Sequence, residues 1–87
     1  MARVIVPSLM RDITDGASEL TATGGSVLSV LEALDQEWPG LLDRLLLDGE
    51  LDPALVVLVD GRPVALGLHA PVEAESEIRF LPAIGGG

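Results

Sequence analysis

One amphipathic helix is the feature that most restricts what this chain can fold into. Five apolar residues recur at the spacing of a single helical face: Val27, Val30, Leu31, Leu34 and Trp38. Ser26 precedes them as a suitable N-cap, and Pro39-Gly40 ends the pattern. Burying the five side chains contributes roughly 10 kcal/mol, so packing rather than helix propensity should hold this segment. A single helix covers one face of one sheet, and the rest of the chain must therefore supply that sheet.

Short apolar or alternating segments on both sides of the helix predict the strands of this sheet. They cover residues 4–6, 19–23, 55–59, 62–66 and 77–81. The segment 55–59 is apolar throughout, as in a strand buried on both faces, so we expect it to be central. Asp60-Gly61 predicts a hairpin leading to 62–66, which should be an edge strand because it contains a proline. A right-handed crossover through the helix would bring 4–6 and 77–81 together at the centre.

The leucine-rich segment after Pro39-Gly40 predicts a further short helix that closes the core. Its leucines at 41, 42, 45 and 46 repeat at a helical spacing, and Gly49 marks its expected end. The order of elements therefore predicts an α+β fold with a mixed sheet of about five strands packed on one main helix. Residues 1–83 should form this single domain and residues 84–87 a flexible C-terminal tail, because 87 residues are too few for two cores.

The strongly acidic composition narrows the range of partners. Five arginines against fourteen Asp and Glu give a formal net charge of −9. This charge repels phosphate backbones and anionic lipid, so we expect neither nucleic acid nor a membrane as partner, but a protein with a basic surface. No apolar run approaches the ~18 residues of a membrane span, and no signal peptide is recognisable, which predicts a cytoplasmic protein.

The few candidate chemical groups inside the domain are weak. The chain contains no cysteine, which excludes disulfides, thiolate metal sites and a cysteine nucleophile. His69 is the single histidine and has no adjacent serine to activate, so we interpret it as a loop residue. Glu73, Glu75 and Glu77 alternate as in a strand and lack the loop pattern of a cation site, which favours a solvated acidic edge. The sequence predicts no metal site.

The end of the sequence, Ile84-Gly85-Gly86-Gly87, is the strongest functional signal. At a glycine frequency of ~7%, glycine at all three final positions arises by chance on the order of 3 times in 10,000. Glycine permits a close backbone approach, so such a tail can enter a narrow channel and present its carboxylate to a nucleotide site. A frayed end without a role is the alternative. In a chain without Cys or Lys, a bare carboxylate gains reactivity by activation from outside, such as adenylation, which would make the tail a substrate.

Several short motifs support this interpretation because their order extends over nearly the whole chain. They are Val4-Ile5-Val6-Pro7, Gly25-Ser26-Val27, Trp38-Pro39-Gly40-Leu41, Val57-Leu58-Val59-Asp60-Gly61 and the stretch from Ile78 to Gly87. In this order, the sequence resembles the ThiS/MoaD family of ubiquitin-like sulfur carriers, and within it the carriers of the CysO type. The family usually ends in Ala-Gly-Gly, from which Gly85 departs. The resemblance implies a ubiquitin-like β-grasp fold.

The resemblance also implies a function for the tail. The Gly87 carboxylate would be adenylated by an E1-like enzyme of the MoeB/ThiF type and converted into a thiocarboxylate, with Gly86, Gly85 and Ile84 providing access. The partner enzyme would use ATP, whereas this chain would bind no cofactor and would not itself be an enzyme. The sulfur would pass to a biosynthetic enzyme such as a cysteine synthase, or to one that makes a sulfur-containing cofactor or natural product.

Three alternatives remain open at this point: the small subunit of molybdopterin synthase, a ubiquitin-like protein modifier, and an interaction domain with an inert tail. In the carrier interpretation, partners would dock on the sheet face opposite the helix, close to the tail. Exposed apolar residues beside a functional terminus favour such contacts. The predicted partner-binding residues are Leu58, Val64, Phe80 and Leu81.

Overall fold

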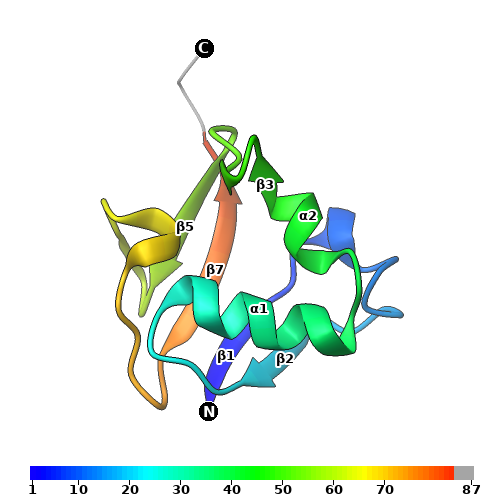
Figure 1. Ribbon diagram of the computed structural model, residues 1–87, viewed down its shortest axis with the longest axis horizontal. Helices are drawn as coiled ribbons and strands as arrows, with labels where there is room; N and C mark the ends of the chain where they lie inside the picture. Colours follow the sequence, from blue (N-terminus) through cyan, green and yellow to red (C-terminus); the bar gives the residue numbers. More distant parts are fainter. Residues whose placement is uncertain (84–87) are drawn as a thin grey trace.

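The computed structural model describes residues 1–83, which form one mixed sheet with a helix packed across it (Figure 1). In chain order the elements are β1 (Ala2–Ile5), the 3-10 helix η1 (Ser8–Met10), β2 (Glu19–Ala22), α1 (Val27–Glu37), α2 (Leu41–Leu45), β3 (Leu46–Leu47), β4 (Glu50–Leu51), β5 (Leu55–Val59), β6 (Arg62–Pro63), the 3-10 helix η2 (Gly67–His69) and β7 (Glu77–Pro82). The five-stranded sheet has the order β2-β1-β7-β5-β6. The predicted α+β β-grasp fold is therefore confirmed.

The first and last strands lie side by side at the centre of the sheet, as the sequence predicted. They run parallel, with Val4 opposite Ile78, while β2 and β5 flank them in antiparallel pairs. Ile78 is completely buried and Phe80 nearly so, because both face the helix. The two side chains form part of the core beneath α1.

Helix α1 begins where the sequence predicted and is fixed at its N-terminus. The Ser29 backbone N–H donates to Ser26 Oγ at 3.2 Å, and the Ser26 backbone N–H donates to Ser29 Oγ at 2.9 Å. The Val27 N–H also donates to the Ala70 carbonyl at 3.0 Å. These bonds satisfy donors that a helix start leaves without partners. Of the five residues predicted on the buried face of this helix, those at 27, 30, 31 and 34 are buried. The fifth, Trp38, is the C-cap of α1 and only partly buried, and it packs against the core.

The region after α1 differs from the predicted helix in its second half. Leu41 and Leu45 are buried in α2, as expected, but the chain then forms the β3–β4 hairpin instead of continuing as helix to Gly49. Asp48 and Gly49 form its turn with φ values of +54° and +82°. This conformation suits a two-residue hairpin turn and is incompatible with a right-handed helix.

Strand β5 is less buried than its apolar sequence predicted. Only Val57 of the five residues is buried, and the other four are partly exposed. The helix covers one face of the sheet, so Val56 and Leu58 on the opposite face remain partly open to solvent. Leu55 and Val59 share the face of Val57 and pack against the core cluster. The edge strand β6 spans only residues 62–63 rather than 62–66, and a single further bond, Val64 N–H to the Val57 carbonyl at 3.3 Å, extends the pairing.

Helix α2 is also connected to the loop that precedes β2. Arg44 donates to Asp12 Oδ2 at 2.9 Å, and both side chains are largely exposed. The guanidinium beside Asp12 lowers the pKa of that carboxyl below its ordinary value. None of the helices in residues 1–83 has the length and apolar character needed to cross a membrane.

Candidate functional site

The end of β7 fixes the position of Ala83, the last described residue, and we call this position the exit. Leu55 pairs with Pro82, and the Ala83 N–H donates to the Ala54 carbonyl at 2.8 Å. These bonds hold the last described residue against the beginning of β5. The predicted reacting residue Gly87 and the predicted access residues Ile84, Gly85 and Gly86 lie outside the described residues.

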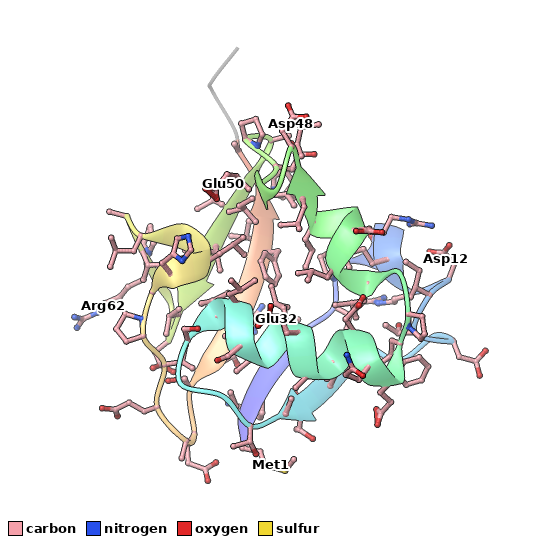
Figure 2. The ribbon with its side chains drawn as sticks, in the orientation of Figure 1. Met1, Asp12, Glu32, Asp48, Glu50 and Arg62 are labelled. Atoms are coloured by element: carbon pink, nitrogen blue, oxygen red, sulfur yellow. The ribbon has the colours of Figure 1, made fainter. Side chains whose placement is uncertain are left out.

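The β3–β4 hairpin lies beside this exit. The Asp52 N–H donates to the Leu45 carbonyl at 2.8 Å, and Asp52 Oδ1 accepts from the Ala54 N–H at 2.9 Å. The hairpin is therefore linked, through residues 52–54, to the residue that bonds Ala83. Figure 2 shows Asp48 and Glu50 at the end of the molecule where the described chain stops.

The four residues after Ala83 limit how far from the exit the predicted reaction at Gly87 can take place. Four residues follow Ala83, and four fully extended residues span at most ~14 Å. Any group that reacts with the Gly87 carboxyl must therefore act within about this distance of Ala83.

The sheet face opposite the helix presents an apolar surface next to the exit. Val56 lies opposite Leu81, and Leu58 lies opposite both Arg79 on one side and Pro63 on the other. Because side chains alternate along a strand, these residues point away from the core. We call Val56, Leu58, Pro63 and Leu81 the outer-face patch. Leu81 is 44% exposed and lies two residues before Ala83.

Two of the four predicted partner-binding residues lie on the wrong face. Phe80 is only 5% exposed. Side chains alternate along a strand, so Phe80 points to the helix while its neighbour Leu81 points to the outer face. Phe80 pairs with the buried Val57 of β5. Val64 packs against the core cluster rather than on the outer face. Strand alternation from Leu58 would have identified Val56, whereas the position of Pro63 depends on the register of β6.

Charged residues occupy the other end of the outer face. Arg3 lies 3.5 Å from Glu77 and 3.7 Å from Glu19, and the Arg79 Nε donates to Glu77 at 2.7 Å. The predicted acidic edge is thus partly neutralised, since Glu77 contacts two guanidinium groups. Glu73 and Glu75 remain exposed.

No cluster suited to bind a metal ion is present among the described residues. Within residues 1–83, no group of three or more His, Asp or Glu side chains is placed to hold a metal ion. His69 is exposed at the end of η2, consistent with the predicted loop histidine. The candidate site of this domain is therefore its surface around the exit.

Comparisons with known proteins agree with this geometry. Residues 4–87 match the family model described as the ThiS family. Small archaeal modifier protein 3 of Haloferax volcanii is 38% identical over 68 residues, which cover 76% of this chain and 71% of that protein.

Solved structures show the same similarity. A chain of the Amycolatopsis orientalis BexX/CysO complex has a TM-score of 0.89 at 28% identity, with all of both chains covered. Small archaeal modifier protein 1 of Methanosarcina acetivorans has a TM-score of 0.77 at 25% identity, over 99% of this chain and 95% of that one. Mycobacterium tuberculosis CysO, at 24% identity over 97% of this chain and 100% of that one, shares the fold with a TM-score of 0.87.

Proposed function

Because the chain belongs to the ThiS family of ubiquitin-like sulfur carriers, we propose that the Gly87 carboxyl group is its reacting group and carries sulfur as a thiocarboxylate. The observation that carries this proposal is the extent of the family match, which runs through the three terminal glycines. In this proposal the chain is a protein co-substrate and not an enzyme.

The chemistry proceeds in two steps on a partner of the E1-like MoeB/ThiF type. A Gly87 carboxylate oxygen attacks the α-phosphorus of ATP, which forms the acyl-adenylate and releases pyrophosphate. A hydrosulfide ion then attacks the acyl carbon and displaces AMP, and loss of the sulfur-bound proton leaves the thiocarboxylate. The partner binds ATP, and this chain binds no cofactor. Gly85 and Gly86 allow a close approach of the backbone to the nucleotide because they have no Cβ.

The outer-face patch is the proposed docking surface for this adenylating enzyme. Its four residues are apolar, Val56 and Leu81 lie near the exit, and Leu81 is 44% exposed. Leu58 and Pro63 continue the patch away from the exit. Burying such a patch supplies a hydrophobic contribution to binding, while the tail enters the active site.

The sulfur acceptor is proposed to be a biosynthetic enzyme. The similarity to a chain of the BexX/CysO complex supports a protein partner for this chain, because that structure is a complex of two named proteins. A cysteine synthase, or an enzyme that makes a sulfur-containing cofactor or natural product, fits the chemistry of a thiocarboxylate donor.

A protein modifier is the second candidate, favoured by the 38% identity to small archaeal modifier protein 3. In that case, the adenylated Gly87 carboxyl would be attacked by an amine of a target protein to form an amide. The two functions share the activation step and differ in the nucleophile that follows.

Intact-mass measurement tests the proposed function. We expect incubation with the adenylating enzyme, ATP and sulfide to replace one oxygen of the chain by sulfur. Deletion of Gly87 should abolish this exchange while the circular dichroism spectrum stays unchanged, because the last residue of a chain generally contributes little to stability. An unchanged mass of the intact chain would contradict the carrier function, and amide-linked conjugates instead of thiocarboxylate would establish the modifier.

A further inference from the structure

The tip of the β3–β4 hairpin is exposed and contributes little to the core. Leu46 and Leu51 pack towards the core, whereas Leu47 is 51% exposed and lies opposite Glu50 in the hairpin. An apolar side chain exposed to this extent gains little from folding. Its position beside the exit makes it available for contact with another molecule.

The short reach of the C-terminal residues brings any acting enzyme to this hairpin. Its active site lies within ~14 Å of Ala83, the span of four extended residues. A stable protein interface covers about 800 Å² on each partner, which corresponds to a disc with a radius of roughly 16 Å. A contact of that size around Ala83 includes the hairpin, because residues 52–54 connect the two directly.

The negative charge around the exit determines the charge that the facing enzyme surface must carry. Asp48, Glu50 and Asp52 lie in or next to the hairpin, and none of them forms an ion pair within residues 1–83. The nearest arginine along β7, Arg79, is four residues from Ala83 and already contacts Glu77. A surface that covers these carboxylates has to supply positive charge, because burying them without a partner is costly.

We infer that the hairpin residues Leu47, Asp48 and Glu50 form a docking surface for the enzyme that acts on Gly87. They contact the mouth of the enzyme channel that receives residues 84–87. This mouth is basic and surrounds an apolar depression that holds Leu47. This inference rests on the proposed function. It adds a contact separate from the outer-face patch. Because the contact follows from the reach of the tail, it applies to every enzyme that acts on Gly87, whereas the outer-face patch can differ between partners.

Charge reversal at the hairpin, with a matched control, tests this inference. Glu50→Arg places a positive charge at the exit, and Glu73→Arg makes the same change in net charge near the beginning of β7, about 20 Å of strand away. Both glutamates are exposed and neither forms an ion pair within residues 1–83, so both variants should fold like the wild type. Leu47→Asn tests the apolar part.

The readout is ATP–pyrophosphate exchange by the adenylating enzyme, as kcat/KM for the carrier. We expect Glu50→Arg and Leu47→Asn to lower kcat/KM about tenfold and Glu73→Arg to change it less than about twofold. Equal effects of Glu50→Arg and Glu73→Arg would overturn the inference and leave the function intact. Absence of exchange with the wild-type chain would instead contradict the proposed function, so the two failures are distinguishable.

Discussion

At the residue scale, position 24 must be glycine because helix α1 lies too close to leave room for a Cβ. The neighbouring sequence does not reveal this contact. A Cβ at this position would lie 2.6 Å from Ser29 Oγ and 2.7 Å from the Val30 backbone nitrogen. We therefore expect Gly24→Ala to lower the free energy of unfolding by about 1 to 3 kcal/mol, because the first turn of α1 would have to shift. Thermal or denaturant unfolding measures this change.

Gly25 provides the control, since a Cβ there would meet nothing within 4 Å. Gly25→Ala should alter the stability by less than about 0.5 kcal/mol, and equal losses for both variants would contradict the steric explanation. The Gly24-Gly25 pair and the Ser26 cap are recognisable as the start of the helix in the sequence. Which glycine is needed depends on how the chain approaches α1, which no local pattern encodes.

At the element scale, the alternation of β7 separates core from surface within two consecutive residues. Phe80 points to the helix and Leu81 to the outer face. We expect Phe80→Ala to cost about 3 to 5 kcal/mol of stability through the cavity it leaves. Leu81→Glu should leave the melting temperature near that of the wild type and weaken binding to the adenylating enzyme. Calorimetry and a binding titration measure the two effects, and an unfolded Leu81→Glu variant would show that the face is assigned wrongly.

The main helix and most strands can be predicted from hydrophobic periodicity. The strand order and the position of the exit then follow, because the right-handed crossover through the helix allows only a few arrangements of these elements. Elements decided by a few residues do not follow so directly. The leucines at 45 and 46 continue a helical repeat, yet the Asp48-Gly49 turn produces a hairpin. Val64, expected on the outer face, continues the register of β6 opposite Val57 and therefore faces the core. Of the outer-face patch, only Leu58 and Leu81 could therefore be predicted from the sequence. The proposed docking role of the hairpin could not be predicted, because it depends on where the hairpin lies relative to the exit.

At the scale of the whole molecule, negative charge is distributed unevenly. Eight of the fourteen carboxylates lie between residues 26 and 61, where Arg44 is the one cationic residue. On the outer face, by contrast, Arg3 and Arg79 are paired with Glu19 and Glu77. The helix and hairpin side therefore carries most of the long-range negative field, while the outer-face patch adjoins a nearly balanced network.

This distribution predicts that charge accelerates the encounter with a basic partner more than it stabilises the bound complex. Exposed charges are screened beyond a Debye length of ~8 Å at physiological ionic strength, whereas contacts of Val56, Leu58 and Leu81 are apolar and insensitive to salt. We expect the association rate constant with the adenylating enzyme to fall about tenfold between low and high salt. The dissociation rate constant should change much less, because the patch and the inserted tail hold the complex. Stopped-flow measurements over a salt series test this prediction. A constant association rate would show that the charge of −9 has no role in steering, and its remaining role would be to limit self-association of an apolar-rich domain.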